Sequence, residues 1–197
     1  MGIEAAKSGK LLYHLTEVDN LPSIITNNLV ARKILLDNST GFEDVANPDI
    51  ISKRTILGLD NYVPFHFHPY SAFDVAVKGT YPDVDFIYIC ITRELAKQND
   101  FKILPMHPLS LADYNGLFDF DEGFQRIDWD TLMERGRTDE YAKHVKMAEC
   151  LTDKTIPVAH FHSIVVKDQK MKQHVEYLLN EGNANNPPPY VNIQNWF

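Results

Sequence analysis

The sequence predicts an α+β fold, because short apolar runs and short amphipathic segments follow one another without a regular β–α alternation. The clearest strand is Phe86–Ile91, a continuous apolar run rich in β-branched residues. The clearest helix begins after Asp168, which is expected to cap it, and ends near Gly182. The sequence contains no glycine-rich phosphate loop of the Rossmann or Walker kind, so the classical dinucleotide-binding and P-loop folds are disfavoured.

The chain has 197 residues, and we expect a single domain over residues 1–197. Its formal net charge of −8 disfavours stable, non-specific binding to nucleic acid, although a local basic strip would suffice for a brief encounter. No apolar run reaches the length of a membrane span, and the N-terminus lacks the apolar segment of a secretory signal. Cys90 and Cys150 lie far apart in apolar segments, so we expect buried free thiols in a reducing cytoplasm.

The stretch from Leu11 to Leu29 predicts a strand followed by a helix. The apolar run at its start is typical of a buried strand, and period-two alternation places His14 and Thr16 on one side of it. Residues typical of helix boundaries follow: Asp19 or Asn20 as a cap, Pro22 in the first turn and Asn27-Asn28 at the end. A helix N-terminus beside such a strand favours a polyanionic cofactor. The alternative is an ordinary strand–helix unit with one core histidine.

The middle of the chain gives weaker signals. Asn47 and Pro48 predict the start of a helix, Ser71 the start of another that Gly79 ends, and Val63–Phe67 a half-buried strand. Pro64 inside that strand predicts an edge strand or a very short one. We expect no regular element in residues 30–47, and the turn-rich residues 105–126 favour a functional or disordered loop.

Histidine pairs at i,i+2 spacing raise the question of a metal site. His66 and His68 form one pair, and His160 and His162 the other. Zinc requires a third ligand, and no further residue has a recognisable spacing, so the sequence predicts no metal site.

Seven blocks of the chain, taken in order, resemble the DarT family, toxins that transfer ADP-ribose from NAD to a nucleobase in DNA. The blocks are YHLTEVDNLPSI, NPDIISKR, NYVPFHFHPYS, DWDTL, KMAECL, SIVV and VNIQNWF. The resemblance implies an ADP-ribosyltransferase-like fold with a central split antiparallel or mixed sheet flanked by short helices. The chain departs from the family at two places that concern the nucleic-acid target. Pro69–Asp74 lacks a basic residue of the family's Pro-Arg-Ser-Pro-Met-Leu block, and Leu104–His107 lacks the family's Phe-Thr-Asp sequence.

The same resemblance implies roles for particular residues. Glu149 would be the catalytic glutamate, and Arg54 the cofactor-site arginine that grips phosphate. The expected contacts to NAD, which is a substrate, are His14, Leu15, Thr16, Ser23, Arg54 and Phe65. The expected contacts to nucleic acid are Tyr70, His107, Arg126 and Lys146. Taken alone, a single glutamate or arginine such as these is more often a solvated surface charge.

The resemblance also implies partners, and several alternatives stay open. We expect a monomeric, cytoplasmic toxin or phage-defence effector that acts on single-stranded DNA, has an antitoxin and has no membrane association. RNA or protein as the acceptor, or a catalytically inactive nucleotide-binding module, are the alternatives. Basic residues before Glu149 would track the polynucleotide: Arg126, Arg135, Arg137, Lys143 and Lys146. Four aromatic residues are candidates for stacking on bases, with core packing expected for at least half of them: Tyr114, Phe118, Phe120 and Phe124.

Overall fold

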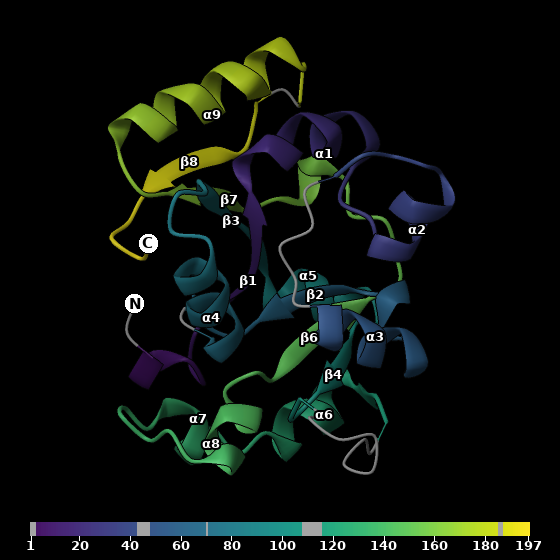
Figure 1. Ribbon diagram of the computed structural model, residues 1–197, viewed down its shortest axis with the longest axis vertical. Helices are drawn as coiled ribbons and strands as arrows, with labels where there is room; N and C mark the ends of the chain where they lie inside the picture. The colour runs from purple at the N-terminus through teal and green to yellow at the C-terminus, as the bar shows by residue number, and fades with distance from the viewer. Residues whose placement is uncertain (1–2, 43–47, 70, 108–115, 185–186) are drawn as a thin grey trace.

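The computed structural model describes residues 3–42, 48–69, 71–107, 116–184 and 187–197. Their centre is one eight-stranded mixed sheet with strand order β5-β4-β6-β2-β1-β3-β7-β8 (Figure 1). The strands are β1 Leu11–Glu17, β2 Val63–His66, β3 Phe86–Thr92, β4 Lys102–Leu104, β5 Phe118–Asp119, β6 Glu149–Thr152, β7 Ser163–Val166 and β8 Tyr190–Ile193. Only β7 and β8 pair in parallel among the described strands. The expectation of an α+β fold is therefore confirmed.

Short helices flank the sheet. They are α1 Leu21–Asn27, α2 Arg32–Asp37, α3 Pro48–Ile56, α4 Ala72–Thr80, α5 Arg93–Gln98, α6 Phe120–Arg126, α7 Trp129–Met133, α8 Glu140–Val145 and α9 Gln169–Glu181. Single 3₁₀ turns are η1 Ile3–Ala5, η2 Val18–Asn20, η3 Leu59–Asn61 and η5 Val158–His160. Ser71 begins α4 with a full capping box, and the Asp168 carboxylate accepts from the Met171 N–H at the start of α9. Both capping predictions are confirmed.

The hydrophobic core lies on both faces of β1 and β3. Ile87, Ile89 and Ile91 are fully buried on one face, while Tyr88 on the other packs edge-on against Tyr13. Burying each such side chain stabilises the fold by roughly 1.5–3 kcal/mol. Cys90 lies in the same strand and, like Cys150, is a buried free thiol, as predicted.

The sheet opens between its two central strands. β1 and β2 are joined at one pair only, Tyr13 and His66, whereas β2 and β6 pair along four residues. The Pro64 carbonyl points towards β1, where it accepts a hydrogen bond from the His14 side chain. In a strand the N–H and C=O of one residue face the same neighbour, so the missing N–H of Pro64 also falls in this opening. The prediction of a very short strand is confirmed, but the edge position is wrong, because Pro64 lies at a local gap inside the sheet.

Two helices lie where the sequence predicted none. In α2, the residue before the helix, Ala31, offers no capping side chain. In α6, Gly123 looks like a turn former but serves for close packing on β4: a Cβ at that position would lie 2.4 Å from the Cβ of Ile103. Gly79 likewise lies inside α4, which ends at Thr80. In the described part of the chain no helix is long and apolar enough to cross a membrane.

Candidate active site

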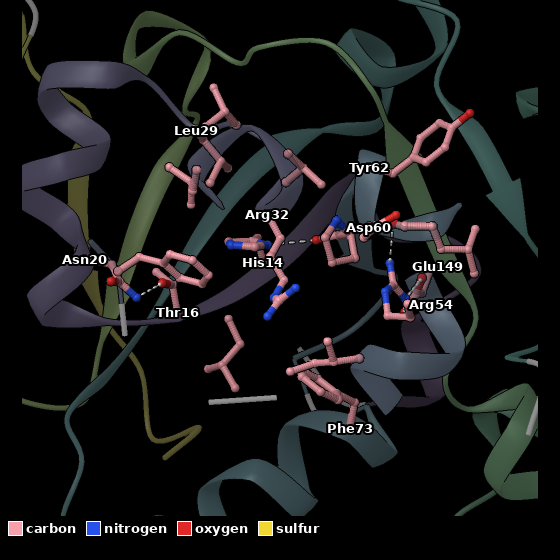
Figure 2. A pocket seen from close by; sticks show the side chains of 18 of the residues that line it. His14, Thr16, Asn20, Leu29, Arg32, Arg54, Asp60, Tyr62, Phe73 and Glu149 are labelled. Atoms are coloured by element: carbon pink, nitrogen blue, oxygen red, sulfur yellow. Dashed lines mark hydrogen bonds and ion pairs between the residues drawn. The ribbon is translucent and has the colours of Figure 1, made fainter. Parts of the chain in front are cut away.

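A cavity of about 200 Å³ opens at the split between β1 and β2. Polar side chains from β1 lie at one end of it, and the α3 and β6 side chains lie at the other (Figure 2). The lining also includes apolar side chains, among them Leu35 of α2 and Ile50 and Ile51 of α3. A cavity with apolar walls and a few convergent polar groups is the usual form of a small-molecule site.

Glu149 and Arg54 form an ion pair at one end of this pocket. Arg54 Nη1 donates to both oxygens of the Glu149 carboxylate at 2.8 Å, and Nη2 donates to the Leu59 carbonyl at 3.4 Å. The two side chains are only 14% and 5% exposed. Burial alone would raise the pKa of Glu149. Arg54, followed by His107 and His66, lowers it by more than burial raises it, so the pKa of Glu149 lies below its ordinary value. Glu149 is therefore an oriented, buried carboxylate anion at neutral pH.

Thr16 lies at the other end, and His14 lies between it and the ion pair (Figure 2). The Nδ1 of His14 is 2.8 Å from the Pro64 carbonyl, which only accepts, so Nδ1 carries the hydrogen and Nε2 carries a lone pair. Burial lowers the pKa of His14 to about 4, so the ring is neutral. The Thr16 hydroxyl accepts a hydrogen bond from the Asn20 amide at 3.2 Å. Asn20 thus precedes α1 without capping it, because its side chain is used by Thr16 instead.

Two further histidines line the Glu149 end. His66 is the cross-strand partner of Glu149 in the β2–β6 ladder, and its Nδ1 lies 3.2 Å from the Ala148 carbonyl. The backbone N–H of His107 donates to the His144 carbonyl, and burial lowers the pKa of the His107 side chain. The sequence raised His66 only as a metal candidate. Among the described residues, no three His, Cys, Asp or Glu side chains are grouped so that they could hold a metal ion.

The structure brings most of the expected NAD contacts together. His14, Leu15, Thr16, Ser23 and Arg54 all line the pocket. Phe65 does not: it is fully buried in the core, with its ring 5.6 Å from that of His14, because it alternates with the pocket-lining Pro64 and His66 along β2. Phe65 therefore packs beside the His14 ring from the side of the core.

Several lining residues had not been expected. They include Arg32 on α2, Asp60 in η3, Tyr62 directly after η3, Phe73 on α4 and Met147 before β6. Arg32 belongs to a helix that the sequence did not predict. The others share no local pattern that distinguishes them from surface or core residues.

The expected nucleic-acid contacts are only partly brought together. His107 lines the pocket, whereas Tyr70 lies outside the described residues. Arg126 pairs with Glu122 on its own helix, and Lys146 Nζ donates to the Arg137 carbonyl. Neither lines the pocket.

Two more residues of the basic run are also paired. Arg135 pairs with Glu4, and Arg137 pairs with both Glu134 and Asp139. These acidic partners offset much of the positive charge that the basic run was expected to offer to the polynucleotide.

The candidate stacking aromatics mostly serve the fold. Phe120 and Phe124 stack on each other at 6.2 Å and pack against the main core, and the Phe118 ring lies 4.2 Å below the Arg126 guanidinium. Tyr114 lies outside the described residues.

Comparison with known proteins shows which family the chain resembles. The sequence model of DarT, described as an ssDNA thymidine ADP-ribosyltransferase, matches residues 13–197. A DNA ADP-ribosyl transferase–DNA ADP-ribosyl glycohydrolase fusion protein of Thermosipho africanus is 23% identical over 180 residues, which cover 87% of this chain and 46% of that protein. The chain thus spans about half the length of this curated relative.

Solved structures share the fold. Thermus sp. 2.9 DarT in complex with ADP-ribosylated ssDNA superimposes with a TM-score of 0.79 at 20% identity, over 96% of this chain and 97% of that one. The same protein in complex with NAD+ gives 0.75 at 19% identity, over 95% and 97%. Thermosipho africanus DarTG in complex with ADP-ribose gives 0.72 at 20% identity, over 93% of this chain and 50% of that one. Because the family's sequence model covers nearly the whole chain, this protein belongs to the DarT family.

Proposed function

We propose that this protein transfers ADP-ribose from NAD to a nucleobase in single-stranded DNA. The observation that carries the proposal is the buried Glu149–Arg54 pair at one end of the pocket in the split sheet. Membership of the DarT family supports the same reaction. The substrates are part of the proposal, since the chain matches only part of its curated relative.

The chemistry suits Glu149. Breaking the bond between nicotinamide and ribose leaves positive charge on the ribose, and a fixed carboxylate anion stabilises such charge most in the transition state. Arg54 holds the anion by both oxygens, which fixes its orientation without a cost at the moment of reaction. The guanidinium N–H groups not spent on Glu149 and Leu59 would bind a phosphate of NAD.

The opposite end of the pocket would hold the rest of NAD. His14 offers an acceptor through Nε2, and the Thr16 hydroxyl and Ser23 add polar contacts to the dinucleotide. The apolar lining, with Leu15, suits the planar rings of the substrate. Arg32 adds a cation beside this end.

The partners follow from the same proposal. His107 would contact the nucleic acid from inside the pocket, while Arg126 and Lys146 stay predictions for contacts outside it. The fusion of a transferase with a DNA ADP-ribosyl glycohydrolase in the relative supports an antitoxin of that activity. Buried free thiols support a reducing cytoplasm, and a monomer stays a prediction.

The test is transfer of label from NAD labelled in its adenylate part. Separate pools of single-stranded DNA, RNA and protein are offered to the wild-type chain and to Glu149→Gln. Label on DNA that depends on Glu149 supports the proposal. Label on RNA or on protein alone would show that the acceptor is that molecule and not DNA. NAD binding without any transfer would indicate an inactive nucleotide-binding module.

A further inference from the structure

Transfer of ADP-ribose to a nucleobase leaves one proton to be removed. The ring N–H or amino group that bonds to the ribose carbon loses its hydrogen as the new bond forms. At the Glu149 end of the pocket, the buried or largely buried titratable side chains are Glu149, Arg54, His66 and His107. Asp60 and Tyr62 also lie at this end (Figure 2), but both are partly exposed and neither belongs to the β2–β6 ladder that carries Glu149. The question is which of the buried groups is arranged to accept that proton.

The ion pair is a poor acceptor. Both oxygens of Glu149 accept hydrogen bonds from Arg54 at 2.8 Å. Although burial raises the pKa of this carboxyl, Arg54 and the two histidines lower it more, and a weaker base takes a proton less readily. The guanidinium of Arg54 has no lone pair to offer.

His66 is held in the tautomer that an acceptor needs. Its Nδ1 lies 3.2 Å from the Ala148 carbonyl, and a carbonyl only accepts, so Nδ1 carries the hydrogen and the neutral ring has its lone pair on Nε2. The residue is only 4% exposed, and its ring lies 5.9 Å from that of Phe73. As the directly opposed residue on the next strand, it shares a sheet face with Glu149.

The other histidines of the pocket are arranged differently. His107 Nδ1 is buried without a hydrogen-bond partner among the described residues, so no contact fixes its tautomer. His14 has a fixed tautomer, but in Figure 2 it lies between the Thr16 end and the Glu149 end. Only His66 of these three combines a fixed tautomer with direct pairing to Glu149.

Resting on the proposed function, we propose that His66 is the general base of the transfer reaction. The bond between the ribose carbon and nicotinamide breaks, and its electron pair leaves with nicotinamide. A nitrogen of the acceptor base forms the new bond to that carbon, and its hydrogen passes as a proton to Nε2 of His66. The resulting imidazolium returns the proton to solvent.

The test separates the acceptor from the leaving group. In His66→Asn the amide nitrogen replaces Nδ1 as the donor to Ala148, but no base remains. His68→Asn is the matched control, because His68 is as buried, at 3%, yet does not line the pocket. We expect His66→Asn to keep the thermal shift given by NAD and the release of nicotinamide to water. Transfer to an oligonucleotide should fall about 10²–10⁴-fold, the usual effect of a general base.

A second variant guards against misfolding and tests the chemistry directly. His66→Ala leaves room for added imidazole, which should restore part of the lost transfer, and restoration is not expected for a residue that only supports the fold. His66→Gln replaces Asn if the Asn protein does not melt cooperatively.

Four results would overturn the inference. Transfer by His66→Asn near the wild-type rate, or no recovery with imidazole, excludes His66 as the base. Parallel loss of nicotinamide release and transfer would place its role on the leaving group, and loss of NAD binding would make it a substrate contact. If the wild-type chain releases nicotinamide but labels no oligonucleotide, the proposed function itself fails.

Discussion

The two edges of β1 serve opposite purposes. Towards β3 the strand is paired without a gap, from Leu11 with Thr92 to Glu17 with Phe86. Towards β2 it is paired once, and the opening beside that pair becomes the pocket. A strand held firmly along one edge can leave the other unpaired without losing its position, so the closed edge supplies the rigidity that the site on the open edge requires.

Apart from the His66 variants, the largest expected effect concerns the open edge. Replacing Glu149 with Gln removes the carboxylate charge but keeps the shape of the side chain. Transfer of labelled ADP-ribose should fall about 10²–10³-fold, as when one electrostatic contact to a transition state is lost. The NAD-induced thermal shift should persist. Glu181→Gln at the exposed end of α9 is the matched control, and near-wild-type transfer by a folded Glu149→Gln protein would refute the catalytic role.

The closed edge should respond in the opposite way. Ile89 is the β3 partner of His14 and is fully buried. Ile89→Ala should lower the free energy of unfolding by about 2–5 kcal/mol, because it leaves a cavity in the core. Urea denaturation measures that loss, and transfer per folded molecule should stay near wild type. A loss of turnover as large as that of Glu149→Gln would show that the two edges cannot be separated.

A smaller effect links the open edge to pH. Burial lowers the pKa of His14 from 6.5 to about 4, so between those values the unfolded chain binds a proton that the folded protein excludes. The stability that this gives is complete above pH 6.5 and is lost as the pH falls towards 4. His14→Asn keeps a donor towards Pro64 without titrating.

The measurement is the free energy of unfolding from urea titrations of both proteins. Between about pH 7 and pH 5 the wild type should lose up to about 2 kcal/mol more than the variant. Identical pH dependence in the two proteins would remove His14 as the titrating group.

The smallest effect lies outside the opening. If exposed Arg126 contacts a phosphate of the polynucleotide, Arg126→Ala should weaken oligonucleotide binding a few-fold and reduce the slope of log K against log salt by about 0.7. The effect is small because Arg126 already pairs with Glu122. Binding measured over a series of salt concentrations gives the slope, and an unchanged slope would exclude this contact.

What the sequence predicted well is what neighbouring residues determine. The apolar run of β3, the cap and length of α9 and the buried thiols all follow from local pattern. The resemblance to DarT identified Glu149 and Arg54, which are 95 residues apart and are brought together only by the fold.

What it missed depends on long-range contacts. Gly123 lies in a helix because Ile103 packs against it, and Phe65 faces the core because β2 lies between β1 and β6. The role proposed for His66 arises from its pairing with a strand more than eighty residues later, which no local period reveals.

The strand order has a consequence for synthesis. β6 is inserted between β2 and β4, both of which precede it in the chain, and it is β6 that carries Glu149. As the chain leaves the ribosome, every other part of the pocket emerges before this strand does. The pocket would therefore be completed late, by the strand that fills the place between β2 and β4. A nascent chain that ends before residue 149 carries the scaffold but lacks the carboxylate, so the cell meets the complete pocket only after most of the chain has been made.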